Sequence, residues 1–149
     1  MTRNRTLPLL LAATLALTLA ACGDDDSDGG GGGGSADLTP ADLDGKTFTG
    51  SEAIDHDLVA GTVVVLNFED GRVTVAGGCN SQSGGYSVVD DRLEVDEPLA
   101  STMMACEPDL EAQDAWLLGL LTSSPELSLD GDTLEIVGDD GGLSLVTGA

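Results

Sequence analysis

The alternation of apolar and polar residues from Leu38 onward predicts β-strands joined by tight turns. Val73 and Val75 alternate with polar neighbours, and this spacing places apolar side chains on one face of a strand. Acidic turn pairs such as Asp70-Gly71, Asp90-Asp91 and Asp130-Gly131 favour short hairpin connections. The strands expected on these grounds are residues 62–68, 72–75, 86–89, 93–95, 127–130, 133–137 and 143–147. The first is almost wholly apolar, which is typical of a central strand covered on both faces.

Residues 108–121 break this rhythm and predict one helix. Pro108 suits a first helical turn, and Asp109 and Glu111 lie near the positive end of the helix dipole. The expected apolar face, interrupted by Asp114 and with Trp116 at its margin, holds Leu110, Leu117, Leu118, Leu120 and Leu121. The patterns together predict an α+β, mainly β domain over residues 37–149. We expect a curved, half-barrel-like antiparallel sheet of about seven or eight strands with one packed helix.

Residues 1–21 have the three parts of an export signal. Arg3 and Arg5 form a positive start, residues 7–20 form an apolar run too short to span a bilayer, and small residues precede Cys22. Leu19-Ala20-Ala21-Cys22 resembles the lipobox of bacterial lipoproteins, in which the cysteine is acylated and becomes the mature N-terminus. The alternative is an ordinary secretory signal with a chance cysteine. We therefore expect an extracytoplasmic protein whose partner is the cell membrane, through lipid on Cys22.

Residues 22–36 predict a disordered tether. The segment contains Asp24-Asp25-Asp26 and six consecutive glycines, 29–34. It has no apolar side chains that could offset the entropy lost on ordering. Such a tether would let a folded domain stand away from the membrane that anchors it.

The charge of the chain excludes one class of partner. The formal net charge is -22, and beyond the leader only Lys46, Arg72 and Arg92 oppose 27 acidic residues. Nucleic acid needs Lys and Arg for counterion release, so we expect no nucleic-acid partner. We expect the charge to serve solubility or adaptation to a salty habitat, and a cation-binding surface is the alternative. Asp130-Gly131-Asp132 and Asp139-Asp140-Gly141 superficially suggest calcium loops but lack the full loop pattern, which favours plain turns.

Cys79 and Cys106 predict a disulfide. An even pair of cysteines in an exported domain usually oxidises, and lipidation of Cys22 accounts for the third cysteine. The alternative is a metal site. It would need further ligands, and the sequence has no Cys-x-x-Cys and a single histidine, His56. We expect neither a metal nor an organic cofactor.

Three motifs around these cysteines resemble a known family. Gly78-Cys79-Asn80, Gly85-Tyr86 and 102–106 (Thr-Met-Met-Ala-Cys) precede an acidic amphipathic helix. In order and spacing they are similar to the META domain of bacterial HslJ-type heat-shock proteins, over about residues 38–147. The resemblance implies a compact, mainly antiparallel β-fold with one helix, a place on envelope lipoproteins, and a link to stress response. It implies no established catalytic residue or cofactor. The family usually opens with a tryptophan where this chain has Phe48, and residues 52–60 look like an insertion.

The motif residues suit structural roles, and a binding surface is the alternative. We expect Gly77 and Gly78 to form a turn with positive φ, and Met103 and Met104 to fill irregular space near Cys106. Asn80 can hold the turn by hydrogen bonds to the backbone. The candidate binding surface consists of Asn80, Ser81, Gln82 and Tyr86, with Ser83 as a further member.

The sequence favours a non-catalytic lipoprotein domain that serves envelope maintenance or stress response through binding. Two alternatives are a surface domain that binds cations or a small ligand, and a hydrolase. A hydrolase would have to use His56 with a serine and an acid, and the chain has no G-x-S-x-G motif. We therefore expect no catalytic residues.

Overall fold

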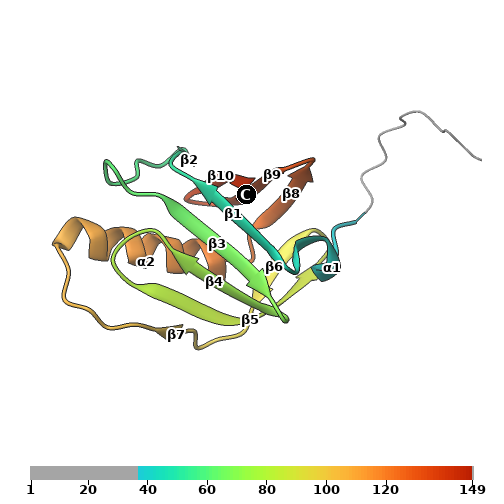
Figure 1. Cartoon of the computed structure of the whole chain (residues 1–149), viewed down its shortest axis with the longest axis horizontal. Coiled ribbons are helices and arrows are strands. Elements are labelled where there is room, and N and C mark those ends of the chain that lie inside the picture. The colour runs from blue at the N-terminus through green and yellow to red at the C-terminus, as the bar shows by residue number, and fades with distance from the viewer. Residues whose placement is uncertain (1–36, 149) are drawn as a thin grey trace, which may run out of the picture. The chain divides into compact units, whose positions relative to one another are not determined.

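The computed structural model describes residues 37–148, so the expected leader, Cys22 and the tether lie outside the described residues. The described residues belong to one compact unit. Its elements in chain order are α1 (Pro40–Leu43), β1 (Lys46–Gly50), β2 (Ala53–Ile54), β3 (Val64–Glu69), β4 (Arg72–Ala76), β5 (Ser81–Val89), β6 (Arg92–Val95), β7 (Ala100–Ser101), α2 (Pro108–Thr122), β8 (Glu126–Asp130), β9 (Thr133–Gly138) and β10 (Gly141–Thr147) (Figure 1). All the strands expected from the sequence are present, and α1, β1, β2 and β7 are additions.

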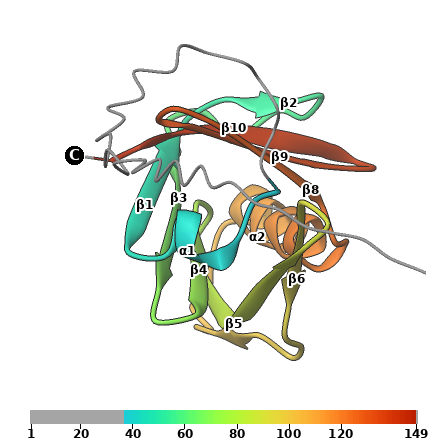
Figure 2. The ribbon, with the colours of Figure 1, turned by 90° about the vertical axis from the view of Figure 1, so that its right-hand side faces the viewer.

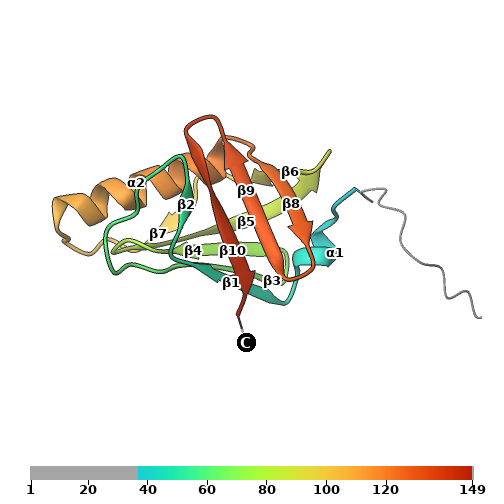
Figure 3. The same ribbon diagram turned by 90° about the horizontal axis from the view of Figure 1, so that it is seen from above.

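The sheet closes into a barrel, which corrects the expected half-barrel. Eight antiparallel strands follow the order β1-β3-β4-β5-β6-β8-β9-β10, and β10 pairs back with β1. Phe48 lies opposite Thr147, and the amide of Gly148 donates to the carbonyl of Thr47 at 2.6 Å. Figure 2 shows the strands surrounding the interior, and Figure 3 shows β8, β9 and β10 crossing over the others. Closure joins β1 and β10, the first and last strands of the described residues, and local residue patterns carry no signal for so distant a pairing.

The pairing of β6 with β8 is the narrowest junction of the barrel. Arg92 and Glu126 form its single register pair. Two backbone bonds flank them, from Leu93 to the carbonyl of Pro125 at 3.0 Å and from Leu127 to the carbonyl of Asp91 at 2.7 Å. Helix α2 packs against β6 and lies between the two halves of the barrel (Figure 2). The helix therefore covers the place where the sheet is least continuous.

Two-residue loops join four strand pairs, as the turn residues predict. In the β3–β4 loop Asp70 has φ 51° and Gly71 has φ 70°. In the β5–β6 loop Asp90 has φ 51° and Asp91 has φ 57°. Two positive φ angles match the twist of the flanking strands. Outside glycine such angles strain most side chains, and Asn and Asp tolerate them best.

Replacement of Asp90 by asparagine should stabilise the domain by about 0.5 kcal/mol, because asparagine is the favoured first residue of such a turn. Asp139→Asn is the matched control, since Asp139 occupies the first loop position between β9 and β10 without a positive φ. Urea unfolding of both variants checks this. Equal stabilisation by the two variants would show that relief of negative charge, rather than turn geometry, causes the effect.

The interior of the barrel is apolar and filled. Its buried residues are Leu43, Phe48, Val64, Leu66, Phe68, Val73, Val75, Tyr86, Leu93, Leu117, Leu120, Leu121, Leu127, Leu134, Ile136, Leu143 and Leu145. Phe48 is fully buried and packs edge-on against Phe68, whose ring also meets Tyr86 at 5.0 Å. Phe48 therefore fills the N-terminal part of the core.

Residues 62–68 are buried on one face only, whereas the sequence predicts a strand that is buried on both faces. Val64, Leu66 and Phe68 point inward, but Val63 before the strand is 54% exposed, and Val65 and Asn67 are only partly buried. The interior of a barrel lies on one side of its wall, so only alternate residues of β3 reach the core.

Helix α2 forms where the sequence predicts it, with a different buried face. Leu117, Leu120 and Leu121 face the core, whereas Leu118 is 36% exposed. Two polar residues, Gln113 and Asp114, are buried in its second turn. Neither α1 nor α2 is long and apolar enough to cross a membrane.

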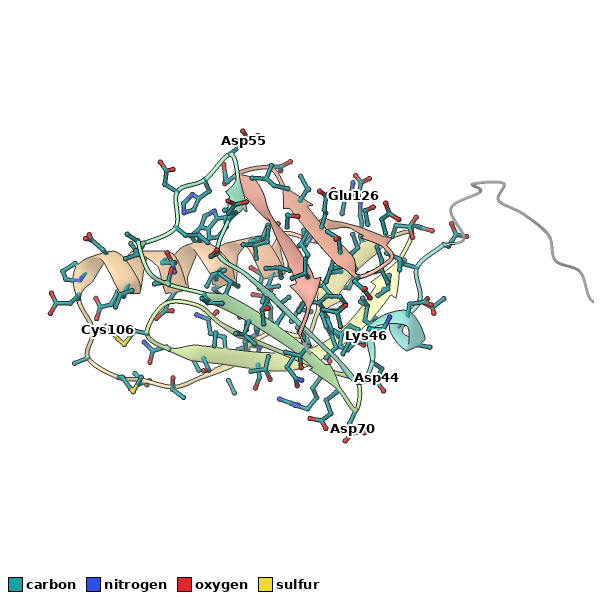
Figure 4. All side chains as sticks on the ribbon, turned by 45° about the horizontal axis from the view of Figure 1, so that its top comes forward. Asp44, Lys46, Asp55, Asp70, Cys106 and Glu126 are labelled. Atoms are coloured by element: carbon teal, nitrogen blue, oxygen red, sulfur yellow. A yellow bond between two sulfur atoms is a disulfide. The ribbon has the colours of Figure 1, made fainter. Side chains whose placement is uncertain are left out.

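Residues 52–60, the segment expected to be an insertion, lie over α2. The ring of His56 stacks on Trp116 at 3.8 Å between centroids, with the planes 2° apart. The amide of Val59 donates to the side-chain oxygen of Gln113 at 2.6 Å. Asp55, labelled in Figure 4, precedes the stacked histidine. The insertion is therefore fixed to the helix by one ring stack and one hydrogen bond.

Candidate functional site

A disulfide ties the turn before β5 to the segment that leads into α2. The structure joins Cys79 and Cys106, as the cysteine count predicts, and their Cα atoms are 6.1 Å apart. Cys106 lies just ahead of the first turn of α2 (Figure 4). We call residues 77–80 together with Cys106 and Asp114 the disulfide corner.

Asp114 organises the disulfide corner. The residue is 6% exposed, and its carboxylate accepts hydrogen bonds from the amide of Cys79 at 3.0 Å and the amide of Asn80 at 2.8 Å. The side-chain NH₂ of Asn80 adds a third bond at 3.1 Å. The residue that interrupts the apolar stripe of the helix is therefore the acceptor for a turn, and a carboxylate accepts such bonds more strongly than a neutral group.

The two glycines before Cys79 are required for close packing. Neither Gly77 nor Gly78 has the expected positive φ. A Cβ on Gly78 would lie 2.7 Å from the carbonyl oxygen of Leu110 and would collide with the Asp114 carboxylate. A Cβ on Gly77 would lie 2.9 Å from the side chain of Val64. The turn can approach α2 only because both positions lack a side chain.

Asn80 holds the neighbouring segment in place. Its side-chain oxygen accepts bonds from the hydroxyl of Thr102 at 3.0 Å and the amide of Met104 at 2.8 Å. The Thr102 hydroxyl in turn accepts a hydrogen bond from the amide of Ser81 at 3.0 Å. Because its NH₂ group is bonded to Asp114, the Asn80 amide connects α2 to residues 101–105.

The four residues of the candidate binding surface do not share one surface. They occupy successive positions before and along β5, where side chains alternate between faces. Ser81 points outward, whereas Gln82 is 6% and Tyr86 9% exposed, and both point inward. Tyr86 donates from its hydroxyl to the carbonyl of Pro40 at 3.2 Å, and burial raises its pKa. Tyr86 therefore belongs to the core, and Ser83, like Ser81, lies on the outer side.

Asn80 and Gln82 share a depression between residues 101–105 and α2. It has a volume of about 440 Å³, and its other lining residues are Ser101, Thr102, Met103, Met104, Ala105, Glu111 and Asp114. Met103 is 96% and Met104 59% exposed, so the expectation that they fill interior space is wrong. In Figure 1 the segment that follows β7 runs to the end of the domain at which α2 begins. The depression combines exposed thioethers with carboxylate oxygens.

Gln82 leaves one hydrogen-bonding atom unused at this depression. Its NH₂ group donates to the backbone carbonyl of Asp114 at 3.1 Å. Its side-chain oxygen has no donor among residues 37–148, although the atom is buried. An acceptor in this state costs about 1–3 kcal/mol. The sequence indicates Gln82 as a candidate because it lies among other polar residues. Its unpaired oxygen could not be predicted, because that feature depends on where α2 packs.

The described part of the chain brings no metal ligands together. No group of three or more His, Cys, Asp or Glu side chains in residues 37–148 could hold a metal ion. Asp130, Asp139 and Asp140 lie in or beside hairpin loops, where turn geometry accounts for them.

The disulfide, the glycines that allow close packing and the Asn80 contacts are the features that the three sequence motifs encode. A family model for the META domain matches residues 39–148, well over half of the chain. The chain belongs to the META domain family. No curated protein matched the sequence.

Two solved structures share the fold of this META domain. One, solved by NMR, is 20% identical, covers 73% of this chain and 94% of its own, and gives a TM-score of 0.59. The other is the NMR structure of a protein from Burkholderia xenovorans. It is 19% identical, covers 82% of this chain and 97% of its own, and gives a TM-score of 0.56. At this level of identity the likeness concerns the fold alone.

Proposed function

We propose that the protein is exported, lipidated on Cys22 and held on the cell membrane, where its META domain acts as a non-catalytic binding module in envelope maintenance or stress response. The observation that carries this proposal is the sequence of residues 1–22. A positive start, a short apolar run and small residues lead to a cysteine, and an acidic, glycine-rich tether follows. Lipid on that cysteine would keep an otherwise acidic domain at the membrane.

Binding, rather than catalysis, is supported by how the polar side chains of the domain are used. The side chains of Asn80 and Asp114 form hydrogen bonds that stabilise the disulfide corner. His56, the histidine that a hydrolase would need, stacks on Trp116. What the corner presents outward is a depression with two exposed methionines. Methionine is common at surfaces that bind other molecules.

Cys22→Ser tests the anchor. Without an acyl acceptor the protein should move from the membrane fraction to the aqueous fraction after cell lysis, because the proposed lipid is the attachment that holds it there. Immunoblotting of the two fractions measures this. The matched control is the double variant Cys79→Ser/Cys106→Ser, which replaces the two bridged cysteines but keeps Cys22 and should stay with the membrane. Retention of the Cys22→Ser protein would refute lipid anchoring.

The envelope role is tested by deleting the gene and exposing cells to heat and membrane-active detergents. We expect greater sensitivity than in the parent strain, restored by the wild-type gene and not by the Cys22→Ser version. Unchanged sensitivity under every such stress would count against the role while leaving the anchor intact.

A further inference from the structure

The outer edge of β7 is free for pairing. β7 pairs with β5 on one side, with Gln82 opposite Ser101. The amide of Thr102 donates to the carbonyl of Ser81 at 3.0 Å. Adjacent residues of an extended strand direct their backbone groups to opposite edges. The N–H and C=O groups of Ser101 therefore face away from β5, and the amide of Met103, just beyond the strand, donates no turn or loop hydrogen bond within residues 37–148.

The depression beside this edge offers acceptors and no basic side chain. Glu111 and Asp114 line it, whereas Lys46, Arg72 and Arg92 do not. At its base the Gln82 oxygen has no donor, in a residue that is 6% exposed. Because that atom has less than 1 Å² of accessible surface, a donor reaches it only if the residues that cover it move. A ligand that suits this depression therefore carries a hydrogen-bond donor, preferably a positively charged one.

The rim adds apolar contact. Met103 and Met104 are exposed on the same segment whose backbone edge is free. The aliphatic stem of lysine or arginine packs well on such side chains while its charged head reaches a carboxylate. A small amine would use the acceptors but would leave the strand edge unpaired. An extended polypeptide uses both, since its backbone adds to the edge and its side chains enter the depression.

We propose that the depression between β7 and α2 binds an extended basic segment of another polypeptide, which pairs with the outer edge of β7 and places a lysine or arginine against Glu111. The partner is a protein with a basic strand or tail, and the strong negative charge of the domain speeds their encounter. This inference rests on the proposed function as a binding module, and it names the chemistry of what is bound.

Fluorescence anisotropy with a labelled decapeptide of alternating Lys and Val tests the proposal. The full lipidated chain is used in nanodiscs of neutral phosphatidylcholine, with empty nanodiscs as the blank. The lysine peptide should bind, and the same peptide with Glu in place of Lys should not. A peptide N-methylated at every residue keeps the charge and side chains but has no backbone donors. Its affinity should fall by about tenfold or more, as expected for strand addition.

Two matched variants locate the site. Glu111→Gln should weaken binding by about fivefold, because it removes a carboxylate that meets the cation. Glu135→Gln removes the same charge on β9, outside the depression, and should leave the affinity within about twofold. In NMR spectra the side-chain amide signals of Gln82 should move when the unmethylated peptide is added.

The proposal is overturned if the lysine peptide fails to bind. It is equally overturned if the methylated peptide binds as well, or if the two glutamate variants are weakened alike, since either result means attraction by overall charge alone. Unmoved Gln82 signals would remove the depression as the place of contact. None of these results affects the anchor, because membrane retention of the full chain is measured separately by fractionation.

Discussion

Replacement of Asp114 by leucine should lower the free energy of unfolding by about 3 kcal/mol, although leucine completes the apolar stripe of α2. Asp114 is 6% exposed, and its carboxylate accepts bonds from the amides of Cys79 and Asn80 and from the Asn80 side chain. Leucine would leave these donors unpaired near the helix, and each unpaired buried donor costs about 1–3 kcal/mol. The apolar contact that leucine gains offsets only part of that loss. Urea unfolding of the unlipidated Cys22→Ser chain measures the difference.

Asp109→Leu is the matched control for this variant. Asp109 is exposed in the first turn of the same helix. The change there removes a favourable charge at the helix N-terminus and should cost no more than about 1 kcal/mol. If Asp114→Leu were as stable as the parent chain, the disulfide corner would not depend on its carboxylate, and our account of the corner would be wrong.

Removal of the disulfide should have an effect of similar size. Cys79 and Cys106 are 27 positions apart, and opening a loop of that length should destabilise the domain by about 3.5 kcal/mol on the loop-entropy model. The double variant Cys79→Ser/Cys106→Ser avoids a leftover thiol. Its urea midpoint should be lower than that of the oxidised chain and unaffected by reductant, while reductant should lower the midpoint of the parent.

Hydrogen exchange can show which part of the domain is destabilised when the disulfide is removed. The amide of Met104 donates to Asn80 beside the bridge, and its exchange should accelerate more than that of Leu66, which lies in β3 on a fully buried position. Equal midpoints of the parent chain with and without reductant would mean that the bridge contributes nothing to stability.

Local patterns were enough to predict the hairpins and the position of α2. Asp70-Gly71 and Asp90-Asp91 mark turns in the sequence because few residues tolerate positive φ, and both pairs have it in the structure. Pro108 marks the start of α2 for an equally local reason. Closure of the barrel has no such local sign, because it depends on Phe48 meeting Thr147 across almost the whole domain.

The candidate site was predicted in part. The motif at Asn80 and the pairing of the cysteines led to the right corner. Strand periodicity alone would have separated Ser81 from Gln82, since adjacent residues of a strand face opposite sides. The role of Asp114 could not be predicted from the pattern of apolar residues along the helix. In that pattern Asp114 is only an interruption, because the amides that donate hydrogen bonds to its carboxylate belong to the distant residues Cys79 and Asn80. The unpaired oxygen of Gln82 becomes visible only once α2 is placed.

The most direct test of the account is intact mass spectrometry of the protein purified from its own membrane. We predict a chain that begins at Cys22 and carries the added mass of acyl groups on that residue. A free thiol at position 22, or a chain that still contains residues 1–21, would contradict lipid anchoring and with it the proposed placement of the META domain.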